Sequence, residues 1–397
     1  MNRRTRKEQF ALLVSVSCLT TTTLPALSPA LPELAEALGV SITVVGWVQG
    51  AVSFPGILTA VLVGYLADRF GGRRVVVVCV AAFTVFGAAG FLADSFPMLI
   101  VLRLLQGLGT PGLMGLSIAL IGELFEDEKD RMRFLGMNLA FVFMVQMIMP
   151  ALSGFIATGG AFRTFLIYLA GIPIGLWALR LKVGRPKGVA SSPLRHVRAA
   201  REDMHRKRTG VDLLGLMAVT GLGVIVNAGA SMTAVPLFLD DAFGTGSAGR
   251  GLVVSAFQAG AIVTALGVLR FIKGRISSRV MTAGLWLMCI GLLVVYLARF
   301  PAMVSLGLAL AGAGFGLVVT LAQRDAIASA SITYRGLVVL TWVAGVRVSQ
   351  VIGPPMASLM TGLIGPRSAF LMIAAIAALA AVSWRPVRGW LKRMVYG

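Results

Sequence analysis

Two arginines stand inside long apolar stretches of the sequence, where charged side chains are rare. Arg347 lies near the middle of the stretch 336–362, and Arg103 lies inside the stretch 97–122. At the centre of a membrane helix such a charge costs about 2.5–3.5 kcal/mol on insertion scales, so it normally faces a cavity or a partner. Gln106 follows Arg103 on the same helical face. Two alternatives stay open: Arg103 could reach the nearby membrane surface, and Arg347 could bond helix carbonyls or glutamines.

The carboxylates have the opposite distribution, since none of the sixteen lies at the midpoint of an apolar stretch. We therefore predict that Arg347 faces an aqueous cavity, where an anionic or acceptor-rich substrate supplies the missing charge. Further cavity candidates are Gln49, Gln146, Asn227, Gln258 and Gln350. If protons are used, peripheral acids must carry them, and the candidates are Asp68, Glu123, Glu33 and Asp94.

No other constellation in the chain predicts chemistry. The three cysteines lie in apolar runs without a CxxC pair, both histidines fall in one basic loop, and HExxH and GxxxxGK[ST] are missing. We expect no enzyme activity, no metal and no cofactor beyond a proton gradient.

Composition places these residues in a membrane. Apolar residues make up 57% and charged residues 13% of the 397, with a mean hydropathy of +0.87. A soluble domain needs roughly a quarter charged residues, so the expected solvent is lipid. The net charge of +20 does not indicate a nucleic-acid partner, because the basic residues form short clusters between apolar runs.

A membrane span needs about 20 mainly apolar residues. We predict an all-α integral membrane protein with twelve such helices, at 9–31, 43–67, 75–94, 97–122, 135–158, 162–180, 212–238, 250–270, 280–298, 301–322, 336–362 and 367–385. In this layout 30 of the 36 Lys and Arg residues fall in the termini and loops of one side. The positive-inside rule then predicts that both termini are cytoplasmic, in the inner cell membrane.

The sequence also repeats itself at an offset of 204 to 206 residues. Arg69 and Pro150, for example, align with Arg275 and Pro354. We predict two pseudo-symmetric six-helix bundles, 1–180 and 212–397, that rock about a midplane site, with a basic linker at 181–211. The linker is expected to lie on anionic lipids, a regulatory partner site being the alternative, and the protein is expected to be a monomer.

The segment between the second and third predicted helices carries the strongest motif. Its glycines and charges are Gly64, Asp68, Arg69, Gly71, Arg73 and Arg74. Glycines allow a tight turn, and Asp68 at the membrane edge could pair with an arginine or a helix N-terminus to lock one conformation. Plain membrane topology would explain the arginines alone. The segment resembles motif A, G-x-L-x-D-R-x-G-R-R/K, of the major facilitator superfamily (MFS), although Gly72 stands where that family usually has a base.

Two further segments resemble motifs of the same superfamily. Arg103, Gln106 and the following glycines are similar to motif B, which implies a role in proton coupling. The fifth predicted helix resembles a degraded motif C, with Val145 and Met149 in place of glycines. Helix bending and close packing are assigned to Gly136, Pro150 and Gly154, and in the repeat to Gly353 and Pro354.

The resemblance implies the MFS fold and a secondary transporter working by alternating access. The leading expectation is proton-coupled efflux of amphiphilic or drug-like small molecules, which would confer drug resistance. The alternative is a carrier of organic anions, lipids or metabolites, by uptake or uniport, that uses the intramembrane arginines. The first helix lacks the acid that many multidrug exporters carry, since residues 18–28 contain none. A third hypothesis is a sensor or scaffold that keeps the fold without transport.

Overall fold

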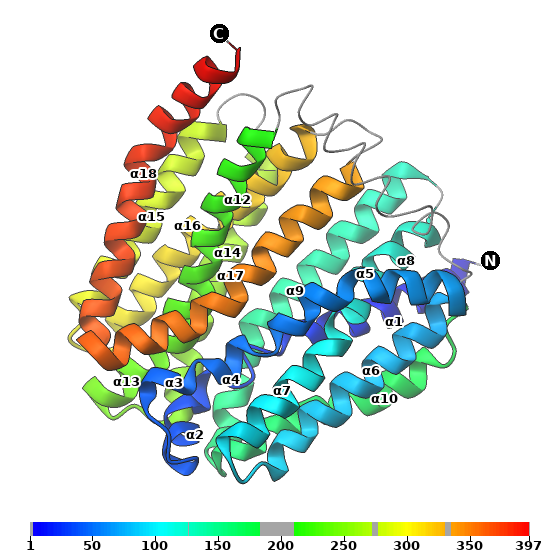
Figure 1. The fold of residues 1–397 in the computed structure, drawn as a ribbon, viewed down its shortest axis with the longest axis horizontal. Coiled ribbons are helices and arrows are strands. Elements are labelled where there is room, and N and C mark those ends of the chain that lie inside the picture. Colours follow the sequence, from blue (N-terminus) through cyan, green and yellow to red (C-terminus); the bar gives the residue numbers. More distant parts are fainter. Residues whose placement is uncertain (1–2, 126, 183–209, 272–276, 330–334, 397) are drawn as a thin grey trace.

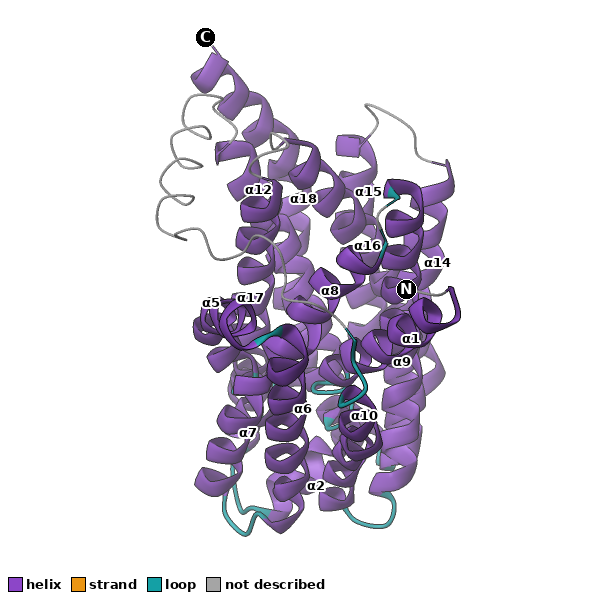
Figure 2. Cartoon of the chain, turned by 90° about the vertical axis from the view of Figure 1, so that its right-hand side faces the viewer, coloured by secondary structure: helices purple, strands orange, loops and turns teal. Residues whose placement is uncertain are grey.

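The computed structural model describes residues 3–125, 127–182, 210–271, 277–329 and 335–396. Within them the chain consists of helices and loops only (Figure 2). Ten helical segments are long and apolar enough to cross a membrane. The other two predicted spans, 9–31 and 336–362, are also helical over most of their length. The predicted linker, 181–211, falls almost wholly outside the described residues, so the domain boundaries stay a prediction.

The first half of the chain supplies the helices α1 (Arg3–Thr21), η1 (Ser28–Ala30), α2 (Leu31–Ala37), α3 (Ile42–Val45), α4 (Trp47–Gly50), α5 (Ser53–Phe70), α6 (Gly72–Ala89), η2 (Gly90–Leu92), α7 (Phe96–Pro111), η3 (Gly112–Leu116), α8 (Ser117–Leu124), α9 (Glu128–Ala157), η4 (Ala161–Ala170) and α10 (Gly171–Ala178). The second half supplies α12 (Gly210–Ile225), η5 (Val226–Ala234), α13 (Val235–Phe243), α14 (Ser247–Phe271), α15 (Ser277–Tyr296), α16 (Pro301–Ser329), α17 (Arg335–Ile364) and α18 (Pro366–Tyr396).

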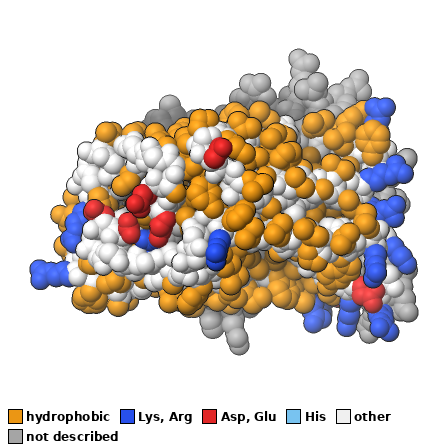
Figure 3. Space-filling view, turned by 90° about the horizontal axis from the view of Figure 1, so that it is seen from below, with side chains coloured by type: hydrophobic (Ala, Val, Ile, Leu, Met, Phe, Trp, Pro, Cys, Tyr) orange, Lys and Arg blue, Asp and Glu red, His pale blue; other side chains and the backbone are white. Residues whose placement is uncertain are grey.

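Each half has its own hydrophobic core. One cluster of buried apolar side chains is drawn from residues 213–384, and the other from residues 10–181 with Leu237 added. Large apolar side chains such as Leu58, Val78, Val263 and Leu379 are exposed on the outside. In Figure 3 basic side chains gather at one end of the visible face and acidic ones towards the other, with mostly hydrophobic side chains between. This distribution suits a protein whose sides face lipid.

The first predicted helix, 9–31, is not continuous, because α1 ends at Thr21. The hydroxyls of Thr21, Thr22 and Thr23 each donate to the carbonyl three residues earlier, at 2.7–2.9 Å. Such side-chain bonds compete with the helix ladder, and Pro25 has no N–H to continue it. The chain therefore turns before η1, and the Thr23 carbonyl is left without a helical donor.

The second predicted helix, 43–67, is likewise divided into α3, α4 and α5. It stops at Gly71, whose φ of 90° suits glycine, and α6 begins at the next residue. The sixth, 162–180, begins as the tight helix η4 before α10. These breaks matter because helix breaks free backbone carbonyls inside the bundle, where polar side chains can use them.

Candidate functional site

Arg103 is the centre of a buried polar network in the first half. Its side chain donates to the Val48 carbonyl at 2.8 Å and to the Thr23 carbonyl at 3.0 Å. It also donates to Gln106 Oε1 at 2.5 Å and to the Tyr168 hydroxyl at 3.0 Å. Only 1% of Arg103 is exposed, so it does not reach the membrane surface. The predicted motif B pair is therefore brought together.

The partners of Arg103 come from four separate parts of the chain. Thr23 follows the break after α1, Val48 lies in α4, Gln106 in α7 and Tyr168 in η4. The Tyr168 hydroxyl also lies 3.3 Å from the Thr23 carbonyl. Gly87 of α6 makes room, because an added Cβ would lie 2.5 Å from Gln106 Nε2 and 2.8 Å from the Tyr168 ring. Arg103 thus ties the broken first span to its bundle, and of its partners only Gln106 was predicted from the sequence.

Arg347 has a different environment. It is half-buried in α17, and it donates to Gln350 Oε1 at 3.2 Å and lies 3.9 Å from the Met114 sulfur of the other half. No carboxylate pairs with it among the described residues. The positive charge of Arg347 is thus left without a counter-ion at the boundary between the halves.

Gln49 is placed between the halves and is fully buried. Its amide nitrogen lies 3.1 Å from the Leu24 carbonyl and 3.2 Å from the Met232 carbonyl, and its oxygen accepts from the Thr233 hydroxyl at 2.6 Å. Gln49 therefore links the first, second and seventh predicted spans.

The other predicted cavity amides are less connected. Gln258 donates to Asn227 at 3.1 Å, while the Gln258 side-chain oxygen is buried with no hydrogen-bond partner in the described part of the chain. Gln146 is half-buried. Gly136 has no heavy atom near its Cβ position, so nothing packs closely there.

Close helix contacts join the halves at the end of the molecule that carries α2, α3 and α13. This end lies at the lower left of Figure 1, away from the start of α1 and the end of α18. A Cβ on Gly46 would overlap the Pro354 carbonyl oxygen, and one on Gly50 would lie 2.7 Å from the Val351 carbonyl oxygen. The Ser358 hydroxyl adds bonds to Gly46 N–H (3.2 Å) and the Thr43 carbonyl (3.1 Å).

The same contact is built a second time from the repeated residues. A Cβ on Gly251 would overlap the Pro150 carbonyl oxygen, and one on Gly154 would overlap that of Ser247. Ser247 also donates to the Gly154 carbonyl at 3.0 Å. Gly46 and Gly251 are 205 residues apart, and Pro150 and Pro354 are 204 apart, which is the repeat offset. We call these two contacts, α3–α4 with α17 and α9 with α14, the seam.

The motif A residues lie at the other end of α5. Gly71 has the positive φ that the turn requires. Gly72 packs on Leu120, since a Cβ added to Gly72 would lie 3.2 Å from the nearest atom of the Leu120 side chain. Both carboxylate oxygens of Asp68 are buried without a hydrogen-bond partner among the described residues. The predicted charge lock is therefore not formed with any described residue while the seam is closed.

The remaining motif A and proton candidates are surface groups. Arg69 donates to the Tyr65 hydroxyl at 3.1 Å, and Arg73, Arg74, Glu123 and Asp94 are exposed. Gly64 lies within α5 and Gly353 within α17. Glu33, in contrast, accepts from Arg250 of the second half. Arg250 is fully buried, and it stands at the first position of the predicted span 250–270.

Comparison with known proteins establishes the family. The sequence signature of the Major Facilitator Superfamily matches residues 10–280 and 217–389. This chain belongs to the Major Facilitator Superfamily. It is therefore a multi-pass membrane protein of a transporter family, which is not a family of enzymes.

Individual MFS relatives are more distant. The Methylenomycin A resistance protein of Bacillus subtilis (strain 168) is 30% identical over 152 residues, which are 38% of this chain and 32% of that protein. Multidrug resistance protein Stp of Mycobacterium tuberculosis (strain CDC 1551 / Oshkosh) is 28% identical over 152 residues, 38% of this chain and 28% of that protein. The match spans less than a third of each relative's own length.

Solved MFS structures have the same fold. The crystal structure of a D-xylose-proton symporter superposes with a TM-score of 0.78 over 95% of this chain and 96% of that chain. The sequence identity is 14%, so the likeness concerns the fold alone. The predicted all-α MFS fold is confirmed.

Proposed function

We propose that this MFS transporter exports amphiphilic or drug-like small molecules in exchange for protons, by alternating access. The observation that carries the proposal is the seam, in which the motif C segment of α9 and its repeat in α17 each close on the opposite half. Two such contacts, related by the repeat, are suited to open and close together. Two of the relatives are named as resistance proteins, which supports the proposed direction of transport.

The proposed orientation puts both termini in the cytoplasm and the seam at the outer side of the inner membrane. We propose that this conformation, with the seam closed and Asp68 unpaired among the described residues, is the one that opens to the cytoplasm. Asp68 would pair when the seam opens and so lock the opposite state. We further propose that the monomer is the working unit and that the basic linker lies on anionic lipids.

A second candidate function rests on Arg347. A half-buried arginine without a carboxylate partner in the described residues suits an anionic substrate, because the substrate would supply the counter-charge. A carrier of organic anions, lipids or metabolites would use Arg347 with Gln350 in this way. Such a carrier could work as an importer or a uniporter.

Growth and accumulation assays in an efflux-deficient host separate these functions. The panel contains cationic dyes, neutral drugs and aromatic carboxylates, each with and without a protonophore. Export predicts lower accumulation in cells that express the protein, and the protonophore should abolish the difference. Higher accumulation of carboxylates alone, unaffected by the protonophore, would instead support the second candidate.

A further inference from the structure

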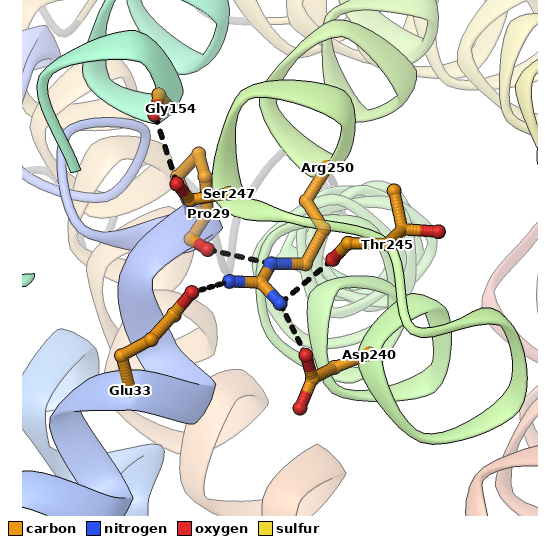
Figure 4. Close-up of polar contacts among 7 residues, drawn as sticks. All are labelled: Pro29, Glu33, Gly154, Asp240, Thr245, Ser247 and Arg250. Carbon is orange, nitrogen blue, oxygen red and sulfur yellow. Dashed lines mark hydrogen bonds and ion pairs between the residues drawn. The ribbon is translucent and has the colours of Figure 1, made fainter. Parts of the chain in front are cut away.

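Arg250, in the first turns of α14, is fully buried and bonded on every side (Figure 4). Its Nε donates to the Pro29 carbonyl at 2.8 Å, and one terminal nitrogen donates to Asp240 Oδ1 at 2.5 Å and to the Thr245 carbonyl at 2.9 Å. The other terminal nitrogen forms an ion pair with Glu33. The partners therefore satisfy the guanidinium from both halves of the protein.

The two carboxylates differ in which half they belong to. Glu33 lies on α2 of the first half, whereas Asp240 lies on α13 of the same half as Arg250. When the seam opens, Arg250 must leave Glu33 and the Pro29 carbonyl, but it can keep Asp240. This difference matters because a buried arginine that loses every counter-ion is strongly destabilised.

The cluster carries one positive and two negative charges, so its net charge is −1 when both acids are ionised. One proton makes it neutral. If Asp240 takes the proton, Glu33 is the only counter-ion left for Arg250 in the cluster, and the Glu33–Arg250 ion pair holds the halves together. If Glu33 takes the proton, the Glu33–Arg250 ion pair between the halves is lost, while Arg250 stays paired with Asp240. The carboxylate that controls separation is therefore Glu33.

Glu33 is placed to exchange a proton with the outer solution. Its side chain is 38% exposed, while its Oε2 is itself buried with no hydrogen-bond partner among the described residues and so has a free position for a proton. Glu33 also lines an open cavity of about 520 Å³ with Ala157, Phe162 and Gly246. A proton can thus reach Glu33 from this cavity while the seam is closed.

Few other charges act on Glu33 from the elements packed against α2. Asp241 follows Asp240 on α13, and Arg163 is exposed on η4. Glu36 lies one turn further along α2 and is exposed. The segments η1 and α3 contain no titratable residue. The charges in direct contact are those of Arg250, Glu33 and Asp240.

We propose that Glu33, Arg250 and Asp240 form a proton-released latch: a proton on Glu33 opens the seam, and Asp240 keeps Arg250 paired while it is open. The proposal rests on the proposed proton-coupled function, to which it adds the acid that senses the outer pH. Protonation of Glu33 removes one charged hydrogen bond from a partly exposed site. The expected shift in the open-to-closed ratio is about tenfold.

Distances between spin labels across the seam test the latch. Ala37→Cys on α2 and Ala242→Cys on α13 place labels on exposed sites of opposite halves, in a background with Cys18, Cys79 and Cys289 replaced by Ala. Double electron–electron resonance in nanodiscs is measured from pH 5 to 8. The wild-type chain should gain the long-distance population as pH falls.

Two variants should move this population in opposite directions. Glu33→Gln, which keeps size and acceptor, should hold the population near its acid value at every pH. Asp240→Asn should deplete the long distance, because opening would strip Arg250 of its last counter-ion. Glu36→Gln is the matched control and should behave as the wild type.

A wild-type pH response in Glu33→Gln, or opening by Asp240→Asn, would overturn the proposal. The readout requires neither substrate nor a gradient. Failure of the latch is thus distinguishable from failure of proton-coupled export, which transport by the wild-type protein tests separately.

Discussion

Substitution of Gly251 by alanine should open the seam. An added Cβ would overlap the Pro150 carbonyl oxygen and would lie 2.9 Å from its carbon and 3.1 Å from Ala151 Cα. All three atoms belong to the α9 backbone, so no side chain can rotate away. The two helices must move apart instead, which only the closed conformation requires.

The size of the effect follows from this difference between conformations. Overpacking of a close contact costs about 1–3 kcal/mol. Alanine also stabilises a helix relative to glycine by up to about 1 kcal/mol, but it does so in both conformations. The gain in helix stability therefore does not change the balance between the two conformations. The overpacking alone should raise the open-to-closed ratio by about 5- to 150-fold. Gly46→Ala should have the same effect, since Gly46 faces Pro354 in the repeated contact.

The label pair at 37 and 242 measures this ratio directly. Gly267→Ala is the matched control, because it lies on the same helix α14 and has no heavy atom within 4 Å of its Cβ position. Equal distance distributions for Gly251→Ala and Gly267→Ala would refute the assignment of the seam as the closed gate.

Three further variants test other parts of the structure. Tyr168→Phe should lower the free energy of unfolding by about 1–3 kcal/mol, because a buried N–H donor of Arg103 loses its acceptor. Thermal unfolding in detergent measures this loss, with Tyr296→Phe as the control. Arg347→Ala should slow proteoliposome transport of aromatic carboxylates by at least about tenfold, because a charged hydrogen bond to the substrate is lost, and it should leave transport of lipophilic cations unchanged. Equal effects on both substrate classes would reject a role of Arg347 in substrate binding. Asp68→Asn should slow turnover and enrich the closed-seam distance, since the motif A lock would stabilise only the opposite state; an enriched open-seam distance would contradict that role.

The helices and the repeat could be predicted because they depend on patterns along the chain. Long apolar runs define spans whatever their partners are, and the offset of 204 to 206 residues relates Pro150 to Pro354 before any contact is known. The Arg103–Gln106 pair could be predicted for the same reason, since three residues separate the two on one helix.

The partners of these groups could not be predicted, because they depend on where helices break. Arg103 binds the Thr23 carbonyl, which is free only because α1 ends at Thr21. Hydropathy gave no sign of that break, although the threonine run and Pro25 offered one. Arg250 stands at the start of the predicted span 250–270, but its burial depends on α2 and α13 meeting across the halves.

Transport by the purified protein in proteoliposomes tests the central claim most directly. Vesicles with an acidic interior are diluted into a neutral medium that contains a lipophilic cationic dye or an aromatic carboxylate. Proton-coupled exchange predicts that the probe accumulates against its concentration gradient only while the pH difference lasts, and that a protonophore releases it. Equilibration of every probe without accumulation, at the same rate with and without the pH difference, would contradict the account.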